Sequence, residues 1–549
     1  MGIFIHMSIS MSVTKKEWEK VYEETLQLVK AFSLAERRKV SCRGIETLCL
    51  VPSVEREEKY GWNKEKSRIG WFADGDYETL HTAEEYSLYR DMVTDDEVDI
   101  DAGDALLGVL PAYLDYEWND PKCNHNYDIW GAKTQGEPYH MYLLAIACLV
   151  ETRLGEKAFV YGDITRGQCK KAVEMANKYL EEPIDIPDRC DMERFYKRVS
   201  NLQLDRKDQF VIFNSFYLGT KDSAYGEYIR CKYTEAVFDE YWKEHFKNYS
   251  IGTIGFDDLI NEYLLWGFEL KKLCRLVNYY DKDNVPQYEK FIKRIMDAKL
   301  HLKSKNCEDT LKIDQEETEP YSIYTLMAQF AFAGARNKKV DRYIPIEIIK
   351  KVLKDELGGK CEVDCIIEEY LQKDKQEQEI DISKLGPDAD LEALCEQDAS
   401  EVFNQMMDMQ IQNLMNTEEK YDISTQEHLM YYEEGDSIEP RLLKALKKSF
   451  IFYDSINEED FYKELMDKPA KVRCEWLVEH NRSILIREKD WNKIFTDIVE
   501  NEKSFSRYYP MMRLELSSTN LIYMTIAIVI NDDLYNFLVG IKGSVESDF

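Results

Sequence analysis

Residues 136–183, GEPYHMYLLAIACLVETRLGEKAFVYGDITRGQCKKAVEMANKYLEEP, carry the clearest local folding signals in the chain. Pro138 suits the first turn of a helix, and Gly155 suits the left-handed residue that ends one. The ten residues MYLLAIACLV between them are apolar on every side, which is typical of a helix surrounded by protein. The pattern predicts a buried helix over residues 138–154.

The second half of this stretch predicts a strand and another helix. Residues 158–161 form a short β-prone run. Thr165 and Gln168 have the spacing of a capping box, in which both side chains satisfy backbone N–H groups at a helix start. Apolar residues then recur at three- and four-residue spacing until Pro183. We call residues 136–183 the hub and expect other elements to pack against it.

Outside the hub, the chain divides into mainly helical and β-prone regions. At 549 residues the protein is long enough for two to four domains, and 44% of its residues are hydrophobic, which supports folded cores. Helical stripes dominate beyond residue 186, whereas short β-prone pieces lie between residues 42 and 89. We therefore predict a mainly α, multi-part helical protein with minor β structure in the N-terminal third.

Composition shifts and polar stretches divide the chain into five parts. They are a disordered leader (1–13), an N-terminal α+β region that holds the hub (14–185), a helical middle region (186–371), a charged linker or loop (372–390) and a C-terminal helical region (391–549). Near the end, residues 511–530 contain alternating apolar positions around a Ser-Ser-Thr-Asn turn. This pattern predicts a possible β-hairpin, with a buried helix as the alternative.

The sequence favours a soluble protein of the cytoplasm. The leader MGIFIHMSISMSV lacks the basic start and long apolar core of a signal peptide. No apolar run approaches the roughly 18 residues that span a bilayer. The 13 cysteines are scattered singly, which is typical of reduced core thiols. We expect no membrane contact, and the oligomeric state stays open.

Charge indicates the kind of partner. The chain has 104 acidic and 72 basic residues, a formal charge of -32, which disfavours general nucleic-acid binding and suits a protein partner with a basic surface. Acidic residues are densest between residues 91 and 121, where Lys and Arg do not occur. Solubility and helix capping are the alternative explanations of this acidity. The predicted partner-binding residues are Asp95, Asp96, Glu97, Asp99, Asp101, Asp104 and Trp118.

Common catalytic signatures do not occur in the sequence. There is no phosphate loop, no GxGxxG, no HExxH, no CxxC pair and no GxSxG. The spacing of Asp99, Asp101 and Asp104 does not match a calcium-binding loop. We therefore expect no metal and no cofactor. The remaining candidates for catalysis are His140, Asp163 and Arg166 in the hub, because a histidine and a carboxylate can form an acid–base pair.

Two hypotheses of function follow from the sequence. The first is a non-catalytic intracellular interaction protein that docks a protein partner through an acidic, aromatic-rich surface, as an immunity-type inhibitor or an adaptor would. The second is an enzyme, a hydrolase that uses the histidine and carboxylates of the N-terminal region. A pocket that brings His140 and Asp163 together would favour the enzyme.

Overall fold

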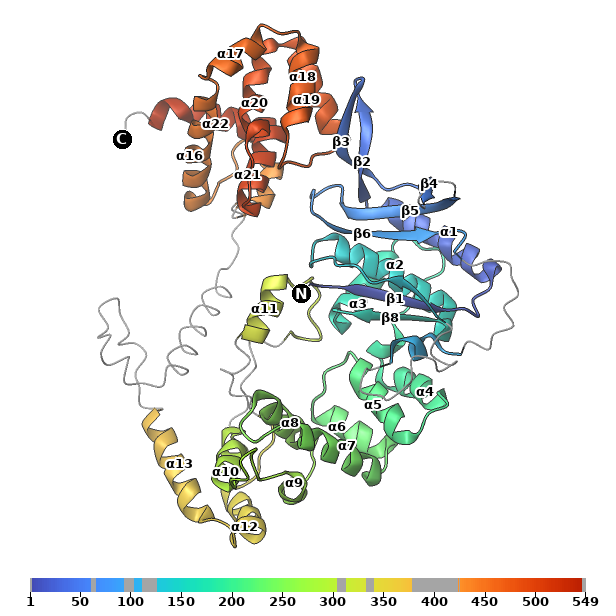
Figure 1. The fold of residues 1–549 in the computed structure, drawn as a ribbon, viewed down its shortest axis with the longest axis vertical. Helices are drawn as coiled ribbons and strands as arrows, with labels where there is room; N and C mark the ends of the chain where they lie inside the picture. Colours follow the sequence, from blue (N-terminus) through green and yellow to red (C-terminus); the bar gives the residue numbers. More distant parts are fainter. Residues whose placement is uncertain are drawn as a thin grey trace.

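The computed structural model describes residues 2–60, 66–92, 103–110, 126–303, 313–331, 340–377, 423 and 425–545. It confirms a mainly α protein whose strands lie mostly in the N-terminal third. Figure 1 shows an arc of three parts. We call them the α/β part (residues 2–187), the middle part (188–377) and the C-terminal lobe (425–545). The α/β part lies at the centre of the arc.

Two antiparallel sheets form the α/β part. The smaller sheet has the strand order β7-β1-β8, and the larger has the order β3-β2-β5-β4 with β6 beside β5. The strands are β1 (Ile5–Ser10), β2 (Leu34–Cys42), β3 (Ile45–Pro52), β4 (Arg56–Tyr60), β5 (Lys66–Asp76), β6 (Thr82–Tyr89), β7 (Asn126–Trp130) and β8 (Ala158–Gly162). The helical elements are α1 (Lys15–Ala31), η1 (Ala105–Val109), α2 (Tyr139–Leu154), η2 (Gly155–Lys157) and α3 (Arg166–Ala176).

The predicted disordered leader is wrong, because residues 5–10 form the central strand of the smaller sheet. Strand β1 pairs with β7 on one side and with β8 on the other. Ile5, Met7 and Ile9 are fully buried. Their alternation with polar residues is the period-two pattern of a strand, and Ser8 and Ser10 on the other face are buried as well, so the mildly apolar start of the chain has a structural role.

The hub folds largely as predicted. Helix α2 begins at Tyr139, is buried over most of its length, and ends against Gly155, which has φ 59°. The capping box of α3 is complete, because Thr165 and Gln168 each accept the other's backbone N–H through their side chains. Helix α3 ends at Ala176, earlier than the expected end before Pro183. Asn177 ends it by exchanging two hydrogen bonds with the backbone of Ile184.

The middle part consists of short helices, most of which pack around one aromatic-rich core that also takes in residues 105–107 and Phe159, whereas residues 323–328 lie outside this core. Its helices are η3 (Asp188–Cys190), α4 (Met192–Asn201), α5 (Arg206–Phe216), α6 (Ser223–Lys232), α7 (Glu235–Asn248), α8 (Ile254–Leu265), α9 (Leu270–Leu276), α10 (Tyr288–Asp297), α11 (Ile323–Ala331), α12 (Ile346–Leu357) and α13 (Val363–Glu377). The first residues of the predicted linker, 372–377, belong to α13. The remainder, 378–390, lies outside the described residues.

The C-terminal lobe is helical throughout its described residues. Its helices are η6 (Glu427–Tyr431), α16 (Pro440–Ile456), α17 (Asp460–Met466), α18 (Ala470–His480), α19 (Glu488–Glu500), η7 (Glu502–Ser504), α20 (Phe505–Arg513), α21 (Thr519–Ile530) and α22 (Asp532–Val545). The predicted hairpin over 511–530 is therefore wrong, and the helical alternative is correct. Residues 523–529 are buried on every side of α21, so their apolar run has no strand-like alternation.

The β2–β3 hairpin joins the C-terminal lobe to the α/β part. Side chains of the hairpin, such as Leu50, belong to the same buried core as helices α16 to α22. The Leu50 N–H donates to the Ile486 carbonyl at 3.0 Å. Nearby, the rings of His81 and Tyr523 stack with centroids 4.4 Å apart. The lobe thus docks on the sheet through both apolar and polar contacts.

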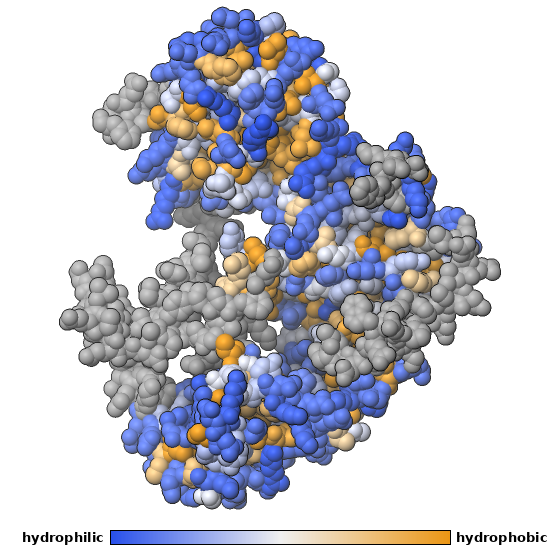
Figure 2. Space-filling model, in the orientation of Figure 1, coloured by the Kyte–Doolittle hydropathy of each residue, from blue (hydrophilic) through white to orange (hydrophobic). Residues whose placement is uncertain are grey.

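Surface hydropathy differs among the three parts. Figure 2 shows a mostly hydrophilic face with apolar residues gathered over the C-terminal lobe and near α11. Among the described residues, no helix alone is long and apolar enough to cross a bilayer. Helix α21 meets those criteria only together with the first part of α22, and the two are bent by 97°.

Candidate functional site

His140 lies inside the hub without access to solvent. Its side chain is fully buried in the first turn of α2, and Nδ1 lies 2.7 Å from the hydroxyl of Thr134. Burial lowers the pKa of His140 to about 4, so the ring is neutral at physiological pH. A neutral, enclosed ring cannot exchange protons with a substrate in the surrounding water. His140 therefore stabilises the turn before α2.

Asp163 and Arg166 do not join His140 in a site. The Asp163 carboxylate accepts the backbone N–H of Phe4 at 3.0 Å, which ties β8 to the start of the chain. Burial raises the pKa of Asp163 above its usual range. Arg166 donates to the Cys190 carbonyl at 2.8 Å and pairs with Glu316 at 2.6 Å. All three predicted catalytic side chains have separate structural partners.

Asp104 is the predicted partner-binding residue that the structure describes, and it is not a surface group. Its carboxylate caps η1 by accepting the N–H of Leu106 at 2.7 Å. The same carboxylate binds Arg198 of α4 through Nε at 2.9 Å and Nη2 at 2.8 Å. This correction follows from burial, because both side chains are below 10% exposed. Asp95, Asp96, Glu97, Asp99, Asp101 and Trp118 lie outside the described residues.

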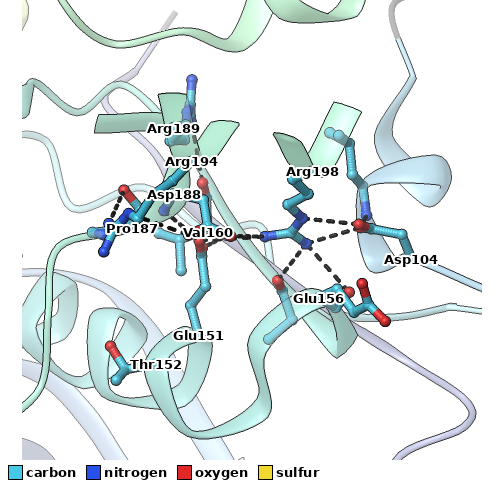
Figure 3. Close-up of polar contacts among 12 residues, drawn as sticks. Asp104, Glu151, Thr152, Glu156, Val160, Pro187, Asp188, Arg189, Arg194 and Arg198 are labelled. Carbon is cyan, nitrogen blue, oxygen red and sulfur yellow. Dashed lines mark hydrogen bonds and ion pairs between the residues drawn. The ribbon is translucent and has the colours of Figure 1, made fainter. Parts of the chain in front are cut away.

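The Arg198–Asp104 pair belongs to a buried polar network between the α/β part and the middle part (Figure 3). Glu151 of α2 accepts the N–H groups of Val160 at 2.8 Å and Asp188 at 3.1 Å. It also lies 3.5 Å from Arg198. Burial raises the pKa of Glu151 to about 7 although Arg198 acts in the opposite direction. Because Arg198 of α4 donates both to Asp104 and to the backbone carbonyl of Ala158, the network holds the two parts together.

A surface cleft opens on the other side of α2. It encloses about 240 Å³ between the end of α1, the end of β5 and the segment after α3. This volume is below the roughly 300 Å³ of small-molecule pockets, and it suits a single side chain. We call it the aromatic–acidic cleft. Its lining residues are Ala31, Phe32, Ser33, Asp76, Glu78, Tyr142, Met175, Lys178 and Tyr179.

Three aromatic rings form one wall of the aromatic–acidic cleft. Phe32 and Tyr142 stack with centroids 5.1 Å apart and planes 13° apart. Tyr179 meets Phe32 edge-on at 5.8 Å, with its plane at 88°. Tyr179 is 51% exposed, although most large aromatic side chains of the α/β part are buried. Aromatic rings attract cations through their electron-rich faces.

Two carboxylates lie beside the rings. Asp76 is buried at the end of β5, where it accepts the N–H of Glu78 at 2.9 Å and the hydroxyl of Thr79 at 3.2 Å. Burial raises the pKa of Asp76 above its usual range. The side chain of Glu78 is 55% exposed and lies 3.9 Å from Arg487 of the C-terminal lobe. The cation among the lining residues is the exposed Lys178.

The sequence offers only a partial signal for this cleft. Asp76 ends β5, Glu78 lies in the turn that follows it, and Tyr179 continues the apolar stripe predicted for α3. Nothing in the spacing indicates that residues 32, 76, 142 and 179 meet. Tyr179 lies beyond the end of α3 at Ala176 and is 51% exposed.

Neither a metal site among the described residues nor a similarity to known proteins assigns a function to this chain. Within the ranges that the structure describes, no group of three or more His, Cys, Asp or Glu side chains is arranged to hold a metal ion. Comparisons of the chain with protein-family models, curated proteins and solved structures give no match. The chemistry of the aromatic–acidic cleft is therefore the basis for a proposal of function.

Proposed function

We propose that this protein is a non-catalytic, intracellular interaction protein that docks a basic partner protein, and that the aromatic–acidic cleft receives a cationic side chain of that partner. The observation that carries the proposal is the meeting of three rings and two carboxylates around a space for one side chain. Arginine suits such a space because its planar guanidinium stacks on rings and binds carboxylates. Arginine is also enriched among the residues that dominate interface energies.

The net charge supports the same partner class. A formal charge of -32 attracts a basic protein over long range and speeds the encounter, while the cleft supplies a specific contact after it. An immunity-type inhibitor of a basic enzyme and an adaptor for a basic protein would both use this combination. The hydrolase alternative relied on His140 and Asp163, whose separate structural partners leave it without a named acid–base pair.

A capture experiment with matched variants tests the proposal. Tagged wild-type protein, Tyr179→Ala and Tyr249→Ala are incubated with lysate from the source cells, and bound proteins are quantified by mass spectrometry. Tyr249 is a suitable control because it is 45% exposed and lies after α7, outside the cleft. We expect a basic protein that wild type and Tyr249→Ala retain and Tyr179→Ala loses. Equal retention by all three proteins would contradict the role of the cleft.

A further inference from the structure

Residues 313–322, with the sequence IDQEETEPYS, cross the first turn of α3 as an irregular segment with a turn at residues 315 and 316, and we call this segment the strap. Three groups of the hub hold the backbone of the strap. The Gly167 N–H donates to the Gln315 carbonyl at 2.8 Å. The Thr165 hydroxyl donates to the Glu317 carbonyl at 2.6 Å, and the Gln168 amide donates to the Glu319 carbonyl at 2.8 Å. The capping box thus also binds a peptide.

Two glycines of the hub allow the strap to approach. A Cβ atom at Gly167 would overlap the carbonyl groups of Glu316 and Glu317. A Cβ atom at Gly136 would overlap the Tyr321 carbonyl, and Gly136 also has φ 80°. Position 167 requires glycine because the backbone of the strap lies so close to it, and not because of its own backbone conformation. This surface is therefore shaped for the close approach of a peptide backbone.

Side-chain charges add selectivity for acidic residues. Arg166 and Lys170 both pair with Glu316, at 2.6 and 2.5 Å, and Lys171 pairs with Glu319. Three cations on one short surface are unusual in a chain with an excess of acidic residues. Together with the positive end of the α3 dipole they favour carboxylates. Backbone contacts thus fix the position of the peptide, and the three cations specify its charge.

The strap is held weakly enough to be displaced. None of residues 313–328 is buried, so the strap and the start of α11 contribute no side chain to a core. Exposed ion pairs of this kind are worth about 0–1 kcal/mol each. Segments with few buried apolar contacts open locally at low free energy. In α11 itself, Tyr324 is 78% and Met327 is 52% exposed.

We propose that the surface formed by Gly136 and the first turn of α3 is a recognition site for acidic peptides of a partner, and that residues 315–321 cover it as the chain's own competitor. This site is separate from the aromatic–acidic cleft and takes the opposite charge. A tethered strap acts at an effective concentration in the millimolar range, so a free peptide competes only when the strap is weakened.

The test uses a fluorescent peptide with the sequence IDQEETEPYS and the full-length protein, with binding followed by fluorescence anisotropy. In the variant Glu316→Lys/Glu319→Lys, two positive charges of the strap face Arg166, Lys170 and Lys171, and this repulsion should release the strap. We expect this variant to bind the peptide at least tenfold more tightly than wild type does, and we expect added salt to weaken the binding. A peptide with its glutamates replaced by glutamines should bind at least tenfold more weakly.

A second substitution keeps the proposal falsifiable. Gly167→Ala in the weakened variant should abolish peptide binding, with folding checked by circular dichroism. Lys170→Glu/Lys171→Glu in the same background changes only surface charge, and it should abolish binding even if Gly167→Ala does not fold. Equal binding to wild type and the weakened variant, no binding to the weakened variant, or binding that survives the charge reversal would overturn the proposal.

Discussion

Arg198 and Asp104 form a two-bond ion pair inside the protein, with side chains only 4% and 9% exposed. The pair joins the first turn of η1 to helix α4 of the middle part. Arg198 also donates to the Ala158 carbonyl at 2.8 Å, so the same guanidinium holds the edge strand β8. Burial alone would lower the pKa of Arg198. The nearby carboxylates, Asp104 above all, raise this pKa by more than burial lowers it, so the side chain stays charged.

Removal of the carboxylate should therefore destabilise the protein strongly. Asp104→Ala removes the carboxylate that forms two hydrogen bonds with the buried Arg198 guanidinium, and breaking a buried ion pair costs about 3–5 kcal/mol in the free energy of unfolding. The matched control is Asp205→Ala, which removes the exposed carboxylate that caps α5, with an expected loss of about 1 kcal/mol. Urea unfolding monitored by circular dichroism gives both values. Equal losses for the two variants would show that Arg198 does not depend on Asp104.

The role of Asp104 could not be predicted from the sequence. Its partner lies 94 residues further along the chain, and the segment around it looks like a uniform acidic stretch. The sequence does predict the alternative role of this acidic segment, the capping of a helix start, and the structure confirms that role for Asp104. A pairing with a distant arginine depends on the packing of α4 against β8, which no local pattern encodes.

Buried His140 should make stability depend on pH. Its pKa is about 4 in the folded protein against 6.5 for an unperturbed histidine. The unfolded chain therefore takes up a proton below pH 6.5 while the folded protein does not, and stability falls as the pH drops from 6.5 to 4. The contribution of this residue is about 3 kcal/mol across that range.

The comparison of wild type with His140→Gln isolates this contribution. The free energy of unfolding of the variant should fall less steeply between pH 6.5 and pH 4, although its value at pH 7 can be lower because the bond to Thr134 changes. Urea titrations at half-unit pH steps give the two curves. Parallel curves across this range would mean that His140 is not held neutral by burial.

The C-terminal lobe should depend on the β2–β3 hairpin for its stability. Leu50→Ala removes a fully buried side chain from the shared core, and such truncations cost about 2–5 kcal/mol. Leu48→Ala on the same strand is the matched control, because Leu48 is 51% exposed. In differential scanning calorimetry the transition temperature of Leu50→Ala should be lower than that of wild type, whereas that of Leu48→Ala should be unchanged. An equal effect of both substitutions would contradict a shared core.

Local signals predicted the hub well, whereas long-range pairing was missed. The boundaries of α2 and the capping box of α3 follow from Pro138, Gly155, Thr165 and Gln168, which act within one turn of each helix. Strand β1 was missed because a single short strand is ordered only by its two neighbours, β7 and β8. The apolar pattern of residues 511–530 fits both a hairpin and a buried helix. In the structure α21 is buried on all sides, which explains why its sequence lacks the alternation of a half-buried strand.

Lys178 should weaken the binding of a cation in the aromatic–acidic cleft. It is the cation among the lining residues, so it competes with a ligand for the carboxylates of Asp76 and Glu78. Lys178→Gln should strengthen the binding of an arginine-rich peptide about twofold to fivefold, in the range of an exposed charge interaction. Lys243→Gln on α7 changes the net charge equally and serves as the control. An equal gain for both variants would indicate only the change in net charge.

The most direct test of the proposed function is the affinity of an arginine-rich peptide for wild type, Tyr179→Ala and Tyr249→Ala, measured by isothermal titration calorimetry. A net charge of -32 attracts any cationic peptide, so the decisive variants must leave the charge unchanged. An exposed cation–π contact is worth about 0.5–1 kcal/mol. Tyr179→Ala should therefore bind the peptide about twofold to fivefold more weakly than wild type and Tyr249→Ala do. Identical affinities for all three proteins would contradict docking in the cleft.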